Sequence, residues 1–101
     1  MIHPTVQDHL TQIRAVLQDN KVQKAYFFGS VCTEDFTDKS DIDIIINFQE
    51  GLDPLTRGDL WWNVYFSLEE MLKRPIDLLT ENSIENPYLK KELERTMQEI
   101  L

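Results

Sequence analysis

Cysteine is almost absent from this sequence, and long apolar runs are absent altogether. Cys32 is the only cysteine among 101 residues, which excludes an intrachain disulfide and favours a reducing compartment. No apolar run approaches the roughly 18 residues that a membrane-spanning helix needs. The first residues lack the basic flank and the apolar stretch of a secretory signal peptide. We therefore expect a cytoplasmic protein without a membrane anchor.

Positive charge is also scarce. The chain has 10 Lys and Arg residues against 18 Asp and Glu residues, and its net charge is -8. A protein that coats nucleic acid needs a basic footprint, so direct nucleic-acid binding is disfavoured. The acidic balance is compatible with a metal-dependent site or with docking to a basic protein. Hydrophobic residues make up 42% of the chain, which at this length predicts a single globular domain over residues 1–101.

Apolar periodicity predicts a first helix and three strands. The helix covers residues 4–20, with Thr5 and Asp8 as a capping box and Asn20 as its stop. Short apolar runs predict the three strands, at 25–28, 41–48 and 76–79. In the second of these strands, alternation turns the even-numbered isoleucines toward a core and leaves the aspartate face open to something polar.

A second helix is predicted after the second strand. It begins with Asp53 as N-cap and Pro54 at the first helical position, and it runs to about Lys73. This helix contains the adjacent pair Trp61-Trp62. Adjacent residues lie about 100° apart on a helix, so one ring can enter the core while the other stays partly exposed. Simple packing and a partner interface both remain open as reasons for the pair.

A last helix is predicted to open at Asn86-Pro87. Its apolar stripe consists of Leu89, Leu93, Met97 and Ile100. The complete order is helix, strand, strand, helix, strand, helix. This order predicts an α+β fold in which a small mixed β-sheet packs against helices.

Two polar features flank the first pair of predicted strands. Gly29-Ser30 follows the apolar run that ends at Phe28, and ten residues separate Ser30 from Asp41 and Asp43. A Gly-Ser turn after a strand can offer backbone N–H groups and a hydroxyl to phosphate oxygens. Residues at i and i+2 of a strand share a face, and two carboxylates held that close repel each other unless a cation lies between them. The combination predicts a site for a divalent metal and a nucleotide triphosphate.

The same residues carry a resemblance to a known family. Gly29-Ser30, the spacer and Asp41-x-Asp43 resemble the nucleotidyltransferase superfamily of polymerase-β type, whose hallmark is Gly-Ser, a spacer and Asp-x-Asp. Asp77, in the third predicted strand, matches the third carboxylate of that family. The resemblance to the minimal nucleotidyltransferases, which consist of the bare catalytic domain, covers nearly the whole chain.

The resemblance implies a polymerase-β-like fold and a set of roles. Asp41, Asp43 and Asp77 would be the catalytic carboxylates and would hold two Mg²⁺ ions. Gly29 would let the backbone approach the phosphates of ATP, and the Ser30 hydroxyl would contact a phosphate oxygen. Minimal nucleotidyltransferases of this kind are often encoded beside HEPN-domain toxins. The resemblance therefore implies an antitoxin that transfers AMP from ATP to a tyrosine hydroxyl of a HEPN toxin.

The spacer departs from the family pattern, in which many minimal members read Gly-Ser-x-Ala-Arg-Gly. The corresponding residues here are Val31, Cys32, Thr33 and Glu34. Thr33 replaces an arginine that could neutralise phosphate charge, although Lys39, Lys73 or Arg74 could compensate. Two alternatives stay open: a weak or inactive antitoxin that acts by binding its partner, and a small-molecule nucleotidyltransferase that acts as a dimer. The expected assembly is a homodimer or a hetero-oligomer with the toxin.

Overall fold

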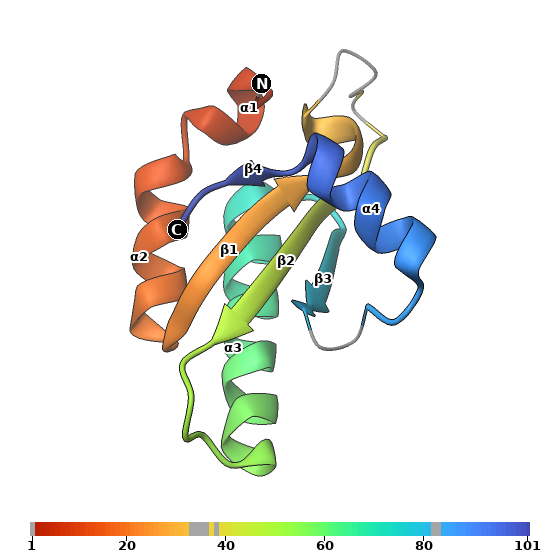
Figure 1. Ribbon diagram of the computed structural model, residues 1–101. Coiled ribbons are helices and arrows are strands. Elements are labelled where there is room, and N and C mark those ends of the chain that lie inside the picture. The colour runs from red at the N-terminus through yellow and green to blue at the C-terminus, as the bar shows by residue number, and fades with distance from the viewer. Residues whose placement is uncertain (1, 33–36, 38, 82–83) are drawn as a thin grey trace.

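The computed structural model describes residues 2–32, 37, 39–81 and 84–101 (Figure 1). Within these residues, none of the helices is long and apolar enough to cross a bilayer. In chain order, the elements are α1 (Pro4–Gln7), α2 (Leu10–Asp19), β1 (Val22–Phe28), the 3-10 helix η1 (Gly29–Cys32), β2 (Ile42–Phe48), α3 (Pro54–Leu72), β3 (Ile76–Thr80), α4 (Pro87–Thr96) and β4 (Gln98–Glu99).

The strands of the described residues form one mixed sheet in the order β3-β2-β1-β4. β1 pairs antiparallel with both β2 and β4, whereas β2 and β3 run parallel. The parallel pair requires a crossover, and α3 supplies it by returning the chain from the end of β2 to the start of β3. The predicted α+β class, with a small mixed sheet packed against helices, is confirmed.

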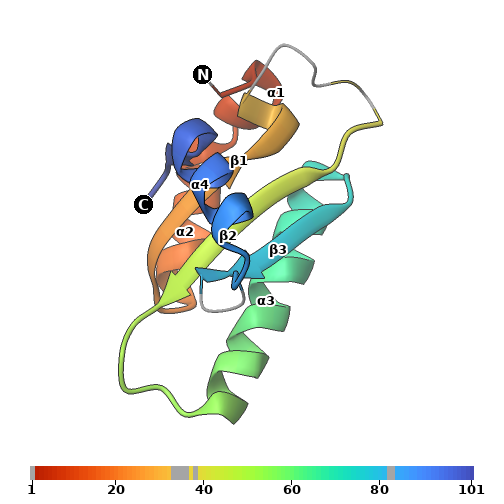
Figure 2. The same cartoon turned by 45° about the vertical axis from the view of Figure 1, so that its right-hand side comes forward.

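Helices cover both faces of the sheet. α2 and α3 lie on one face, where they enclose the main core around Phe27 (Figures 1 and 2). α4 covers part of the other face, where Leu93 forms a smaller core with Phe28 and Ile45. Ile45 is only 4% exposed. The expectation that the aspartate face of β2 opens to something polar is therefore wrong at Ile45, whereas Asp43 and Asn47 on the same face are only half-buried.

The first predicted helix is interrupted between α1 and α2, where His9 adopts φ -104° and ψ 7°. His3 is the N-cap of α1, and its ring nitrogen Nδ1 accepts a hydrogen bond from the Thr5 N–H at 3.2 Å. The predicted capping box of Thr5 and Asp8 is wrong, because the His3 side chain takes the capping position two residues before Thr5. The predicted stop is confirmed, since Asn20 is the C-cap of α2.

α3 has the boundaries that its sequence predicts. The Asp53 carboxylate accepts hydrogen bonds from the Thr56 N–H at 3.2 Å and from the Thr56 hydroxyl at 2.6 Å, and Pro54 follows as the first helical residue. The helix ends at Leu72 because Lys73 adopts a left-handed conformation with φ 54°. Local capping chemistry therefore fixes both ends of the crossover helix.

The tryptophan pair divides between core and surface. Trp61 is half-buried against the main core, and Trp62 is 52% exposed. The two rings meet edge to face at 4.8 Å, while Trp62 also stacks on Phe66 at 5.4 Å between centroids. The prediction that one ring enters the core and the other stays partly exposed is confirmed.

The last helix is shorter than predicted. α4 ends at Thr96, and the chain then adds β4 to the edge of the sheet beside β1. The Lys24 ammonium and the Glu99 carboxylate form an ion pair of 3.0 Å across this edge. Ile100 is 2% exposed in the main core. The prediction that a single helical stripe reaches Ile100 is wrong, because this side chain enters the opposite side of the sheet from the α4 residue Leu93.

Candidate active site

Three strand ends bring predicted site residues to one end of the sheet, the upper end in Figure 1. Gly29 directly follows β1, Asp43 is the second residue of β2, and Asp77 is the second residue of β3. Phe28 lies opposite Asp43 in the β1–β2 pair, and Asp43 lies beside Asp77 in the β2–β3 pair. Residues in register on neighbouring strands point to the same face. The sheet therefore sets the Asp43 and Asp77 carboxylates side by side.

Gly29 makes the closest approach to this carboxylate pair. Its φ is +71°, a conformation that residues with a Cβ rarely adopt. A Cβ built on Gly29 would overlap the Oδ2 atom of Asp43. Both the backbone conformation and the available space therefore require glycine, and the backbone of the η1 turn lies directly against the Asp43 carboxylate.

Asp43 is a half-buried acid in a negative environment. Burial raises its pKa from 3.8 to about 6, assisted by the negative charges of Asp77 and Asp41 and by a side-chain hydrogen bond with Asp77. Each of these causes disfavours the ionised form. The position is electrostatically unfavourable for a carboxylate alone, and a bound cation would reverse that.

Asp41 is exposed and lies immediately before β2. The segment that leads to it is held by Arg74, whose Nη1 donates to the Thr37 carbonyl at 2.9 Å and to the Ser40 carbonyl at 3.3 Å. The Ile42 N–H also donates to the Pro75 carbonyl at 3.1 Å. These bonds tie the approach to β2 to the approach to β3. Sequence analysis offered Arg74 only as a phosphate-binding cation, because nothing in a local pattern reveals a contact across 34 residues.

The structure describes only some of the other residues that the sequence singled out in and around this turn. The Ser30 backbone belongs to η1, but its side chain lies outside the described residues, as do Thr33 and Glu34. Cys32 is half-buried against the main core, and burial raises the pKa of its thiol. The thiol is therefore less readily ionised than an exposed cysteine. Lys39 and Lys73 are both exposed.

The carboxylates supply the oxygen donors that a divalent metal such as Mg²⁺ prefers. No three His, Cys, Asp or Glu side chains within the described part of the chain form a group that could hold a metal ion as they stand. The donor chemistry nevertheless fits Mg²⁺: Asp43 and Asp77 are oxygen donors in register, and the raised pKa of Asp43 reflects crowded negative charge. Asp41 lies close enough to contribute to that charge.

A glycine turn that faces paired carboxylates at one end of a small mixed sheet is the arrangement of a nucleotidyltransferase. The family model described as "Polymerase beta, Nucleotidyltransferase" matches residues 11–101. The chain therefore belongs to the polymerase-β nucleotidyltransferase family, and the resemblance found in its sequence is confirmed.

Known relatives agree with this assignment. "Putative protein adenylyltransferase MJ1379" of Methanocaldococcus jannaschii is 36% identical over 93 residues, which is 91% of each chain. The solved structure of a "putative minimal nucleotidyltransferase" has a TM-score of 0.73 at 22% identity and covers 97% of this chain and 95% of that one, which shows the shared fold. The structure of a tri-AMPylated Shewanella oneidensis HEPN toxin in complex with its MNT antitoxin has a TM-score of 0.65 at 25% identity, covering 94% of this chain and 71% of that one. This protein is thus an enzyme of the nucleotidyltransferase class.

Proposed function

We propose that this protein is a Mg²⁺-dependent adenylyltransferase that transfers AMP from ATP to a hydroxyl of a partner protein. The observation that carries the proposal is the register pair of Asp43 and Asp77 against the Gly29 turn, in a chain of the polymerase-β nucleotidyltransferase family. The proposal treats residues 1–101 as a single minimal nucleotidyltransferase domain that works in the cytoplasm.

The proposed reaction is an in-line displacement at the α-phosphorus of ATP. The oxygen of the acceptor hydroxyl forms a bond to this phosphorus, the bond to the β-phosphate oxygen breaks, and pyrophosphate leaves. Asp77 accepts the proton of the hydroxyl, either directly or through a water molecule. When bound, Mg²⁺ supplies the positive charge that neutralises the triphosphate and the leaving group.

The chain's own residues would divide the remaining work. Asp41, Asp43 and Asp77 would hold the metal ions, whose positive charge would favour the ionised form of Asp43. Gly29 allows the triphosphate to approach the backbone N–H groups of η1, and the Ser30 hydroxyl contacts a phosphate oxygen. Arg74 is a positioning residue, because its two hydrogen bonds to backbone carbonyls fix the segment that delivers Asp41.

We further propose that the acceptor is a tyrosine hydroxyl of a HEPN-type toxin and that this protein is the antitoxin. One structural relative is an MNT antitoxin in complex with a tri-AMPylated HEPN toxin. The net charge of -8 favours docking to a basic, RNA-binding partner. The assembly expected is a hetero-oligomer of the two proteins.

A second candidate is an antitoxin that neutralises its partner by contact alone. The replacement of the family's arginine by Thr33 favours it, because a cation that could bind phosphate is missing from the spacer. The ordered pair of Asp43 and Asp77 favours the enzyme instead.

Intact-mass spectrometry of the protein encoded by the adjacent gene, after incubation with this protein and Mg-ATP, separates the two candidates. The proposal predicts that the partner gains one or more AMP units and that an Asp41→Asn/Asp43→Asn double variant produces no gain. Asp59→Asn is the control for loss of a carboxylate charge, because it removes one such charge at an exposed position of α3 and should leave transfer intact. Tight binding with an unchanged partner mass would support the binding antitoxin.

A further inference from the structure

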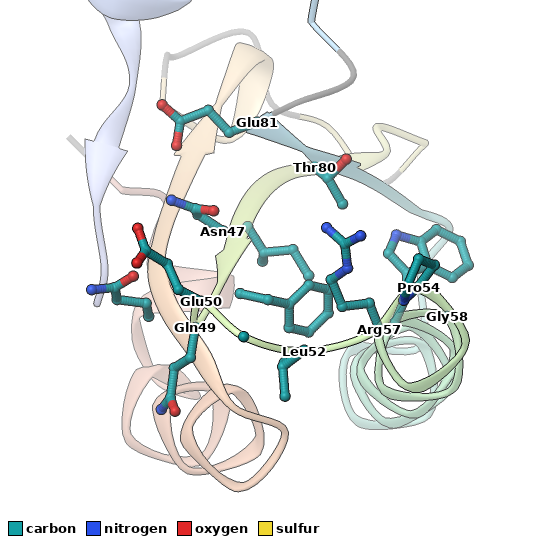
Figure 3. A pocket seen from close by; sticks show the side chains of 14 residues that line it. Asn47, Gln49, Glu50, Leu52, Pro54, Arg57, Gly58, Thr80 and Glu81 are labelled. Atoms are coloured by element: carbon teal, nitrogen blue, oxygen red, sulfur yellow. The ribbon is translucent and has the colours of Figure 1, made fainter.

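A cavity lies at the end of the sheet opposite the carboxylates, and the proposed function does not use it. Its volume is about 550 Å³, and it lies where β2 and β3 end against the first turns of α3 (Figure 3). Asn47 of β2 belongs to its wall and is four residues beyond Asp43 on the same strand, which corresponds to roughly 13 Å. A volume of this size suits a small organic molecule.

Arg57 gives this cavity its chemical character. Its side chain extends from α3 into the space, opposite Thr80 and beside Leu52 (Figure 3). The Nε atom of Arg57 is buried and has no hydrogen-bond partner among the described residues. A buried donor without a partner is unfavourable, because it has lost water and gained nothing in return. The guanidinium is a planar fork of donors that matches the two oxygens of a carboxylate.

The other residues that line the cavity restrict the chemistry of a ligand whose anionic group pairs with Arg57. Phe48, Leu52 and Trp61 supply apolar and aromatic surface near Arg57. The exposed acids Glu50 and Glu81 lie on the side of the cavity away from Arg57 (Figure 3). Like charges repel, so these two carboxylates oppose the entry of a polyanion such as a nucleotide triphosphate. A ligand with a single negative charge and a flat apolar body complements Arg57, the apolar surface and the two acids together.

We propose that this cavity is a second ligand site, which binds a small aromatic or planar monocarboxylate through the Arg57 guanidinium and the apolar surface of Phe48 and Trp61. The site is separate from the Asp43–Asp77 pair and does not depend on the proposed adenylyl transfer. Because β2 and β3 carry residues of both sites, the ligand would be bound within the same rigid sheet that holds the carboxylates.

Sodium benzoate is the probe, added to the full chain and followed by NMR. The proposal predicts saturable shifts of the Arg57 Nε–H and the Trp61 indole N–H resonances. Benzamide has the same ring without the charge. It should bind at least about tenfold more weakly than benzoate, since a hydrogen bond to a charged group contributes about that factor or more. Phenyl phosphate, a dianion of similar shape, should also bind more weakly because of Glu50 and Glu81.

Two variants separate a binding role from a structural one. Arg57→Met keeps the length and loses the donors, so it should abolish benzoate binding and raise the thermal midpoint of the ligand-free protein. Arg57→Lys keeps the charge without the planar fork, and it should bind benzoate at least several-fold more weakly. Arg14→Met is the matched control, because Arg14 Nε already donates to the Ile100 carbonyl at 2.8 Å. This control should lower the thermal midpoint and leave benzoate binding unchanged.

Three results would overturn the proposal. The first is the absence of saturable shifts at Arg57 and Trp61. The second is benzoate binding that Arg57→Met and Arg57→Lys both retain. The third is benzamide that binds as tightly as benzoate, since the cavity would then select a ring and not an anion. None of these results bears on adenylyl transfer, which the mass measurement tests separately.

Discussion

At Asp43, a carboxyl group lies half-buried beside Asp77 and near Asp41, and its pKa is about 6 instead of 3.8. A group whose pKa is raised by folding stabilises the fold while it is protonated. That contribution is complete below the unfolded value of 3.8 and is lost as pH rises through about 6. The metal-free protein therefore carries an unfavourable charge at Asp43 at neutral pH, which is the expected condition of a carboxylate that works with a cation.

Asp43→Asn should abolish adenylyl transfer and stabilise the metal-free protein. After allowance for solvent screening of this half-exposed group, the gain in unfolding free energy above pH 6 is about 1–2 kcal/mol. It should disappear as pH falls toward 4, where the wild-type carboxyl is neutral. Urea unfolding with a chelator at pH 5 and pH 8 measures this difference. A loss of stability at pH 8 would contradict the electrostatic account of the site, and Asp59→Asn controls for the general change of net charge.

Gly29→Ala tests the contact between the η1 turn and the carboxylate. The left-handed backbone alone costs roughly 1–2 kcal/mol with a Cβ present, and the overlap with Asp43 Oδ2 adds to this. Adenylyl transfer should also fall, since the Asp43 carboxylate must move to make room for the added methyl group. Gly51→Ala is the matched control, because Gly51 has φ +88° and open space around its Cβ position. Gly51→Ala should lose stability and keep transfer, and equal transfer by both variants would contradict the predicted role of Gly29.

Part of this site could be predicted from residues alone, and part could not. Alternation along two strands correctly assigns Asp43 and Asp77 to faces opposite their apolar neighbours. The register that makes them adjacent is a property of the parallel pair, which no local pattern specifies. The Gly29 overlap and the Arg74 bonds likewise depend on segments that are distant in sequence.

At the scale of elements, capping chemistry fixes the crossover helix α3. Hydrogen bonds from the Thr56 hydroxyl and the Thr56 N–H lower the pKa of Asp53. A group whose pKa is lowered by folding stabilises the fold above its unfolded value of 3.8, and this stabilisation is lost as pH falls through the folded value. The contribution of this cap should therefore be present at neutral pH and absent in acid.

Asp53→Ala should lower the thermal midpoint at pH 7, because the first turn of α3 loses its acceptor. The gap between the thermal midpoints of the variant and the wild type should begin to close as the pH falls below 3.8, and it should be closed once the pH is below the lowered pKa of folded Asp53. Asp53→Asn keeps an uncharged cap, so the difference between its thermal midpoint and that of Asp53→Ala should not change with pH. Scanning calorimetry from neutral to acidic pH gives all three curves, and a gap that widens in acid would contradict this account.

β4 is the element that sequence analysis missed. A two-residue strand has no periodicity of its own, and Leu89, Leu93, Met97 and Ile100 continue a helical spacing past the true end of α4. The first helix was misjudged for a related reason, since apolar spacing passes through the break at His9. Strong local signals, such as Asp53-Pro54 and Asn86-Pro87, placed helix starts correctly.

Ile100→Ala should cost about 2–4 kcal/mol of unfolding free energy, because it empties part of the main core beside β1. Leu89→Ala is the control. Leu89 belongs to the same apparent helical stripe, yet it is 46% exposed, so its loss should change stability by no more than about 0.5 kcal/mol. Chemical denaturation of the two variants measures the contrast. Equal costs would mean that the C-terminal residues pack as a helix instead of as a strand.

For the whole molecule, the mixed sheet explains how a small chain can hold the two proposed sites apart from each other. One end of the sheet gathers Gly29, Asp43 and Asp77, and the other end closes over the Arg57 cavity. The element order was enough to predict the α+β class, since few arrangements accommodate three strands and interspersed helices. The cavity was not predictable, because its walls come from strand ends and a helix that meet only in the folded chain.

The central claim is that this protein transfers the adenylyl group of ATP to its partner through the Asp41, Asp43 and Asp77 carboxylates. The most direct test incubates it with the protein of the adjacent gene, Mg²⁺, and ATP labelled either at the α-phosphate or at the γ-phosphate. The account predicts that the α label alone becomes covalently attached to the partner, and that Asp43→Asn abolishes attachment. Attachment of the γ label, or of no label while the two proteins still bind, would contradict it.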